Sequence, residues 1–198
     1  MPEPERGKLP DLTDMADVLE SGLLTSLTKW AAEARIDEAA QQRIRERWLR
    51  QQAAEEATMA GILVDLAERD RPVLLRTVAG RTHRGLLAAV AVDFCAIRTA
   101  QDVDVLITFD GVSSLHTQPG DAPTTGARAL TLDLMLHEAL AELALDRPRV
   151  LVLCRGDQEG IAGELRSVGR DVLTLRLDGR PAPLAYVPLT SVVEVASV

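Results

Sequence analysis

DRPVLLRTVAGRTHRGLL, residues 70–87, and DRPRVLVLCRGDQEGIAGEL, residues 146–165, follow the same order of residue types. Each begins with Asp-Arg-Pro, continues through a β-branched and leucine-rich run, passes glycines and polar residues, and returns to apolar sequence through a glycine. Self-similarity at a fixed offset is typical of an internal repeat. The sequence therefore predicts that one structural unit occurs twice.

The two copies keep an offset of 78 residues over the sequence that follows. In each copy a glycine precedes an aspartate by eight residues, and an aliphatic residue follows the aspartate by four. The matched positions are Gly85 and Gly163, Asp93 and Asp171, and Ile97 and Leu175. We expect each aspartate at the turn into a third strand, with its side chain bonded to its own backbone. Further along, 107–115 aligns with 187–195, two residues further displaced.

The repeated segments have the period of β-strands. Apolar residues alternate with polar ones in 103–109, with Leu106 the exception, and in 173–177, which is typical of half-buried strands. In the second strand of each copy the apolar residues lie three apart, at Leu87 and Val90 and at Leu165 and Val168. This spacing breaks strict alternation and predicts a β-bulge or a sharp bend, which lets a short strand serve two sides of a small closed sheet.

Three stretches favour helices. In 12–30 and 131–146, apolar residues recur three and four positions apart. The stretch 38–69 is rich in Ala, Glu, Gln and Arg. A continuous helix there would reach about 48 Å at 1.5 Å per residue, so we expect part of it to pack on the other N-terminal helix or on a second copy of the chain.

These patterns together predict an α+β fold. An N-terminal helical region (1–69) precedes a first small five-stranded antiparallel β-barrel (70–117). A linker and connecting helix (118–146) lead to a second such barrel (147–198). Each barrel is thus preceded by a helix, which we expect to cover an open end of its marginal core. The two modules are expected to remain separate, without merging into one continuous sheet.

The order of these glycines, aspartates and short strands resembles Sm-like and SH3-like small barrels. Over about residues 38–196, it looks like a family of uncharacterised actinobacterial proteins, in which a charged helix precedes two such units. What the resemblance implies is a fold. The RNA pocket of Sm-like proteins does not carry over, because Asp110-Gly111 and Thr190-Ser191 stand where that family has Arg-Gly.

Sm-like barrels commonly pair their edge strands to build rings, and a tandem chain can satisfy one such edge internally. Pro188 falls in the fourth strand of the second copy, where Thr108 stands in the first. Because proline removes one backbone donor, we expect the second barrel to be the poorer partner along that edge.

Composition excludes several classes of protein. The net charge of −8 argues against indiscriminate nucleic-acid binding, so no DNA partner is predicted. No apolar run is long enough for a membrane span or a signal peptide, which favours a cytoplasmic location without a membrane partner. Cys95 and Cys154 read as small core residues, and His83, His116 and His137 have no metal-ligand spacing. We therefore predict no metal, no cofactor, no catalytic residue and no enzymatic activity.

The function favoured by these patterns is that of an interaction or scaffold protein, which binds a protein partner or a second copy of itself. Aromatic and aliphatic anchors dominate protein contacts. The candidates in the helical region are Trp30, Ile44, Trp48, Leu63 and Leu66. The alternative for these residues is packing inside the molecule.

RNA binding through a basic barrel face is the alternative function. The candidate residues are Arg71, Arg76, Arg81, Arg84, Arg166, Arg170 and Arg176. Phosphate contacts by arginine make RNA affinity fall with salt. The structural alternative for these arginines is an ordinary solvent-exposed position on a strand.

A third possible function is the binding of a small ligand in a pocket between the two barrels.

Overall fold

The computed structural model describes residues 22, 25, 29, 35, 38, 40–124, 126 and 132–198. The chain divides into two compact units, Met1–Gln51 and Gln52–Val198. Most of the helix expected over 12–30 lies outside the described residues.

The helix expected over 38–69 is interrupted. Residues 40–55 are helical, and a second helix, α2, covers Met59–Glu68. Thr58 between them has extended backbone, and its Oγ1 accepts a hydrogen bond from the Gly61 N–H at 3.0 Å. A threonine in this position caps the start of a new helix. Residues 40–68 therefore do not form one continuous helix.

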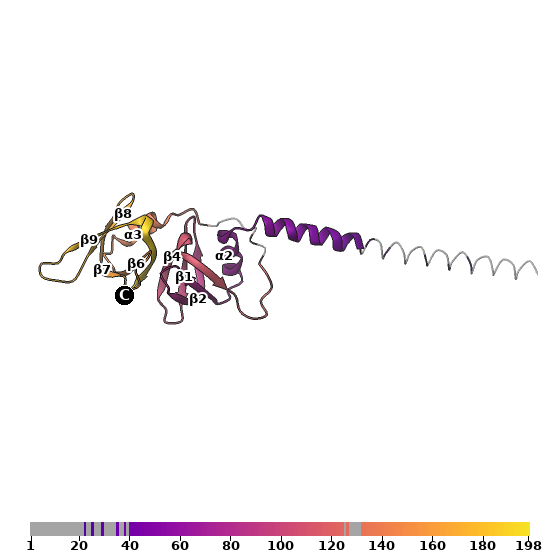
Figure 1. Cartoon of the computed structure of the whole chain (residues 1–198), viewed down its shortest axis with the longest axis horizontal. Helices are drawn as coiled ribbons and strands as arrows, with labels where there is room; N and C mark the ends of the chain where they lie inside the picture. The colour runs from indigo at the N-terminus through magenta and orange to yellow at the C-terminus, as the bar shows by residue number, and fades with distance from the viewer. Residues whose placement is uncertain are drawn as a thin grey trace, which may run out of the picture. The chain divides into compact units, whose positions relative to one another are not determined.

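In the part of the chain that the structure describes, ten strands and one further α-helix follow α2 (Figure 1). The first five strands are β1 (Val73–Thr77), β2 (Thr82–Val90), β3 (Phe94–Thr99), β4 (Asp104–Thr108) and β5 (Val112–His116). Helix α3 (Leu136–Leu143) then precedes β6 (Arg149–Cys154), β7 (Ile161–Val168), β8 (Val172–Arg176), β9 (Leu184–Pro188) and β10 (Val192–Ser197). Short 3-10 helices, η1 (Phe109–Gly111) and η2 (Leu189–Ser191), join β4 to β5 and β9 to β10.

The ten strands form one antiparallel sheet in the order β5-β1-β2-β3-β4-β10-β6-β7-β8-β9. The α+β class and the antiparallel strands are as expected. The separation of the two copies is not, because β4 pairs with β10 and joins both halves into one sheet. The sheet is also not closed: β5 pairs with β1, and neither β5 nor β9 has a second neighbour among the described strands.

The pairing confirms that the two halves repeat one another. The register between β2 and β3 shifts between Leu87 and Ala89, and that between β7 and β8 shifts between Leu165 and Ser167, at the same offset of 78 residues. The irregularity predicted in the second strand of each copy is therefore present. The main-chain carbonyls of Asp93 and Asp171 accept equivalent hydrogen bonds, from Phe109 N–H at 2.9 Å and Leu189 N–H at 2.8 Å.

The Asp-Arg-Pro triplets, in contrast, are one residue out of register. Val73 opposes Gly85, whereas Val150 opposes Gly163, so the first strands match at an offset of 77. The positive φ angles before these strands follow this offset, at Asp70 (49°) and Arg147 (51°). The shared feature is therefore a left-handed residue ahead of the strand, occupied by a different member of the triplet in each copy.

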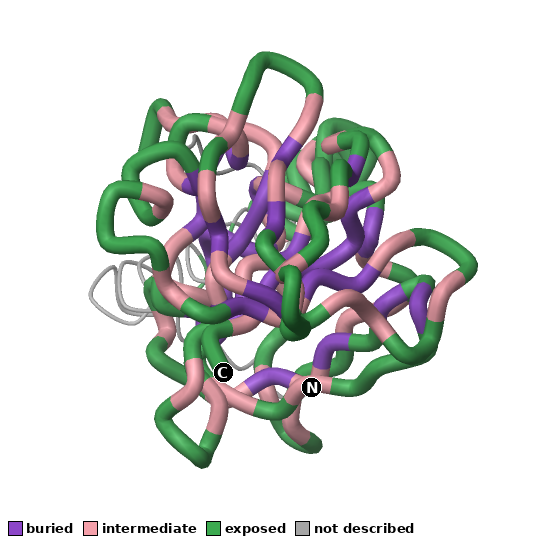
Figure 2. The backbone as a smooth tube through the Cα atoms, turned by 90° about the vertical axis from the view of Figure 1, so that its left-hand side faces the viewer, coloured by how far each residue is buried: buried purple, intermediate pink, exposed green. Residues whose placement is uncertain are grey.

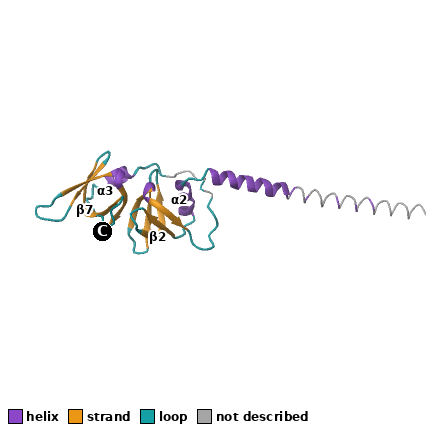
Figure 3. Ribbon diagram, in the orientation of Figure 1, coloured by secondary structure: helices purple, strands orange, loops and turns teal. Residues whose placement is uncertain are grey.

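The buried residues, purple in Figure 2, form two main apolar clusters, and one helix packs into each of them; the helices α2 and α3 are labelled in Figure 3. Leu63, Val64 and Leu66 of α2 pack with the buried residues of β1 to β4. Leu136 and Leu140 of α3 pack with those of β6 to β10, and Ala91 and Phe94 of the first half join this second cluster. A helix that buries its apolar stripe this way adds the surface that five short strands lack.

Candidate functional site

The most distinctive region is the junction between the two halves, where β4 meets β10. Residues Glu194, Val195 and Ala196 oppose Ile107, Leu106 and Val105. At the end of this ladder the Thr108 hydroxyl lies 3.3 Å from the carbonyl oxygens of both Val192 and Val193. The junction is therefore made by backbone pairing and extended by a threonine side chain.

A largely buried hydrogen bond between two side chains crosses the same junction. Glu194 in β10 is 2% exposed, and its Oε2 lies 2.8 Å from Nε2 of His83 in β2. Glu194 opposes Ile107, a core residue of the first half. A strand of the second half, β10, therefore places this carboxyl group inside the first half. A buried carboxyl group needs such a partner because burial of a polar group without a hydrogen bond is costly.

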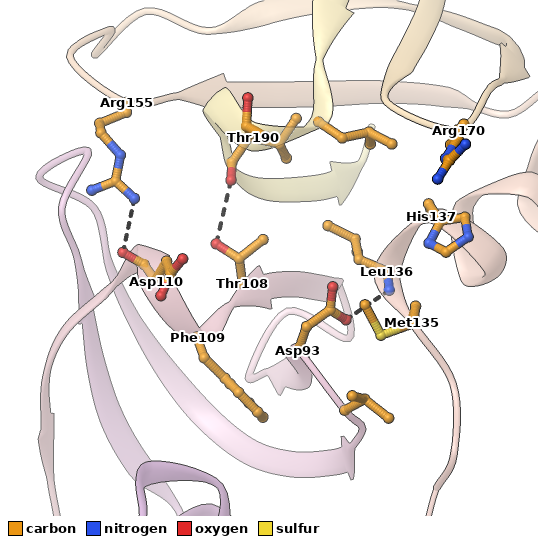
Figure 4. Close-up of a pocket in the computed structure, with 13 residues that line it drawn as sticks. Asp93, Thr108, Phe109, Asp110, Met135, Leu136, His137, Arg155, Arg170 and Thr190 are labelled. Carbon is orange, nitrogen blue, oxygen red and sulfur yellow. Dashed lines mark hydrogen bonds between the residues drawn. The ribbon is translucent and has the colours of Figure 1, made fainter.

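A cavity of about 410 Å³ lies between the two halves (Figure 4). The turn before β3, η1, the start of α3 and η2 all contribute to its wall. At one side Arg155 donates to the main-chain oxygen of Asp110 at 3.2 Å, and Arg170 and His137 line the other side. Its volume falls within the range of small-ligand sites.

Asp93 in this cavity corrects one expectation. Its Oδ1 accepts a hydrogen bond from the Leu136 N–H at 2.8 Å, and so bonds the first turn of α3 rather than its own backbone. The side chain of Glu138 accepts from Met135 N–H at 2.8 Å at the same helix end. Two carboxylates therefore accept hydrogen bonds from the backbone N–H groups at the start of α3. The N–H groups of Met135 and Leu136 are thus not free to bind a ligand in the cavity.

The expected interface residues fall into three groups. Trp30 lies outside the described residues. Ile44 and Trp48 are exposed on the helix at 40–55, at 66% and 62%. Leu63 and Leu66 are 0% and 1% exposed in the core of the first half. They serve as core residues, the alternative that the pattern had left open, because the helix break turns α2 onto the sheet.

The seven candidate arginines do not share one environment. Arg166 pairs with Glu164 at 2.7 Å, and Arg71 lies 3.9 Å from Asp121. Arg170 lines the junction cavity, while Arg81 and Arg176 are exposed elsewhere on the two halves. Arg76 and Arg84 line a common pocket. RNA binding through these residues stays a prediction.

Several other sequence features have a definite place. Cys95 is buried and Cys154 is half-buried, and both are free thiols. No group of three or more His, Cys, Asp or Glu side chains among the described residues is arranged to hold a metal ion. In the same part of the chain, no helix has the length and apolar character to cross a membrane.

Sequence reasoning missed the pair of His83 and Glu194. A glutamate between two valines in an alternating strand reads as a solvated position. Only the pairing of β10 with β4 shows that this position faces the first half.

Comparison with protein-family models, with curated proteins and with solved structures finds no match to this chain.

Proposed function

We propose that this chain is a cytoplasmic, non-enzymatic interaction protein that binds further copies of itself through the edges of its sheet. In this proposal each half is an open Sm-like unit, in keeping with the resemblance of the sequence to tandem small-barrel proteins. The observation that carries the proposal is the junction of β4 with β10. It joins the fourth strand of one unit to the fifth strand of the next.

The same two surfaces recur at the outer ends of the sheet. The strand β9 is the repeat equivalent of β4, and β5 is the equivalent of β10. Exposed edge strands present unpaired backbone groups that template pairing with another chain. Applied to two copies, the register of the internal junction pairs Ser114 with Val187, Leu115 with Tyr186, and His116 with Ala185.

The junction between copies is expected to be weaker than the internal one. Thr108 contributes a hydroxyl to the internal ladder, and the equivalent residue of β9 is Pro188, which has neither hydroxyl nor N–H. Tyr186 offers compensation, since it is 67% exposed on β9 and an aromatic side chain buries a large area. Association should therefore be reversible and depend on concentration.

Light scattering across a range of protein concentrations tests this proposal. Pro188→Thr restores the hydroxyl and the donor, and is expected to shift association to lower concentration. Tyr186→Lys removes the anchor and places a charge on the edge, and is expected to shift association to higher concentration. Leu145→Lys, at an exposed residue away from both edge strands, is the matched control. A mass that stays monomeric in the wild type and in Pro188→Thr would remove the proposal.

The helix at 40–55 supplies a second contact in the same proposal, with another copy of this helix as its partner. Ile44 and Trp48 lie four residues apart and thus on one helix face. Trp48→Glu is expected to weaken association further, whereas Gln42→Glu on the same helix changes charge without removing an apolar anchor. If Trp48→Glu and Gln42→Glu associate equally, the helix is excluded from the interface. The contribution of the sheet edges is then decided by the variants at Pro188 and Tyr186.

A further inference from the structure

A second pocket, of about 300 Å³, lies on the outward face of β5, β1 and β2. Arg84, Leu74 and His116 stand in one row across these strands, and Arg76 lies two residues along β1 from Leu74. Diagonal neighbours across a strand pair are about 7–8 Å apart, within reach of long side chains. Arg76 and Arg84 can thus direct their guanidinium groups to one point.

The charge of this pocket is unbalanced. None of the eight residues that line it is acidic. Other arginines on the sheet have a carboxylate on the same or a neighbouring strand: Arg98 bonds Asp104 at 2.8 Å, and Arg166 bonds Glu164 at 2.7 Å. Arg76 and Arg84 have no carboxylate within 4.0 Å among the described residues. Two neighbouring cations without a counter-charge suit a doubly charged anion.

The remaining wall is apolar. Pro72, Leu74 and Pro119 line the pocket beside the two arginines. Its volume is at the lower end of the range for small-ligand sites. We infer that this pocket binds a small phosphorylated ligand, with the phosphate on Arg76 and Arg84 and the organic part on Pro72, Leu74 and Pro119. The second half lacks the site, because Leu153 and Ala162 occupy the positions of Arg76 and Arg84.

Calorimetric titration of the full chain with AMP, inorganic phosphate and adenosine tests the inference. AMP is expected to bind more tightly than phosphate, and phosphate more tightly than adenosine. Arg84→Gln and Arg76→Gln should each weaken AMP binding by roughly ten- to a hundredfold, the effect of losing a hydrogen bond to a charged group. Arg176→Gln, which removes an exposed arginine from β8, is the control and should leave binding unchanged.

Four results would overturn the inference. One is adenosine binding as tightly as AMP, and another is equal AMP affinity in Arg84→Gln and Arg176→Gln. The third is that a ten-nucleotide oligouridylate binds far more tightly than AMP, and that its affinity falls with salt concentration as steeply as several phosphate contacts require. That outcome would assign this face of the sheet to RNA binding. Failure of AMP and phosphate to bind folded wild-type protein also counts against it. Circular dichroism of each variant shows that the fold is intact.

Discussion

The carboxylate of Glu194 and the imidazole of His83 lie 2.8 Å apart, although 111 residues separate them in the sequence. The side chains are 3% and 14% exposed. Glu194 belongs to the last strand, and His83 belongs to the second strand of the other half. The pair therefore ties the two copies together at a largely buried point.

Removing one member of this pair should be costly. His83→Ala leaves Glu194 buried without its partner, and is expected to lower the free energy of unfolding by roughly 1–3 kcal/mol, the cost of an unsatisfied buried polar group. Glu194→Gln keeps a hydrogen-bonding group of the same shape and is expected to cost less. Urea denaturation measures both. As a control, Arg98→Ala breaks an exposed pair and should change stability little, so equal losses in all three variants would argue against a special role for the junction pair.

The exposed pair of Arg98 and Asp104 predicts a small acid-dependent contribution. The hydrogen bond from Arg98 lowers the pKa of Asp104. A carboxyl whose pKa is lower in the folded state stabilises the fold above its unfolded pKa of about 3.9, and this contribution disappears as pH falls through the folded value. Asp104→Asn should thus cost less than about 1 kcal/mol at pH 7, because water screens a half-exposed pair. Thermal melts of the wild type and of Asp104→Asn at pH 7 and at pH 2.5 check this. The difference in stability between the two proteins should be smaller at pH 2.5, which lies about 1.4 units below the unfolded pKa. A difference that is the same at both pH values would assign the loss to another contact.

The two cysteines should react differently. Burial raises the pKa of the Cys95 thiol to about 12, so almost none of it is thiolate at pH 8. Cys154 is half-buried at the end of β6. With Ellman's reagent at pH 8, we expect the folded protein to release one equivalent of chromophore, and the denatured protein two. Cys154→Ser should abolish the reaction of the folded state, and a persistent signal in that variant would show that Cys95 is accessible.

The matched glycines predict unequal costs. A Cβ on Gly85 would overlap the main-chain oxygen of Arg98, whereas one on Gly163 would lie 2.8 Å from that of Arg176. Gly85→Ala is expected to destabilise by about 3 kcal/mol or more, and Gly163→Ala by about 1–2 kcal/mol. Gly169→Ala meets Val172 at an ordinary 3.4 Å and serves as the control, within about 0.5 kcal/mol. Denaturant unfolding that ranks Gly163→Ala as the costlier change would contradict this reading.

Periodicity predicted the local structure well because strands and bulges depend on near neighbours. The three-residue spacing of Leu87 and Val90 reports a bulge that the β2–β3 register contains. Matching glycines and aspartates at one offset also located the repeat. The Asp-Arg-Pro alignment was one residue out, since the feature that the structure repeats is a backbone angle, which residue identity reports only indirectly.

The rest depends on contacts between distant segments, which a single sequence does not contain. The alternation of apolar and polar residues along a strand does not predict that β10 lies beside β4. It therefore does not predict that Glu194 is buried. Composition alone does not separate the helix at 40–55 from α2, and so does not distinguish Leu63 and Leu66, which are buried, from exposed anchors. A capping threonine is a readable signal, and it would have placed both leucines on a separate, packed helix.

The position of β10 between β4 and β6 has a consequence during translation. The ribosome makes β10 after the other nine strands, so the first half emerges with the edge of β4 bare and His83 without its carboxylate. Bare strand edges on partly made chains are prone to pair with neighbours. On a crowded polysome, nascent copies therefore pass through an interval in which the first half can capture the wrong strand, and that interval ends only when Val192–Ser197 leaves the exit tunnel.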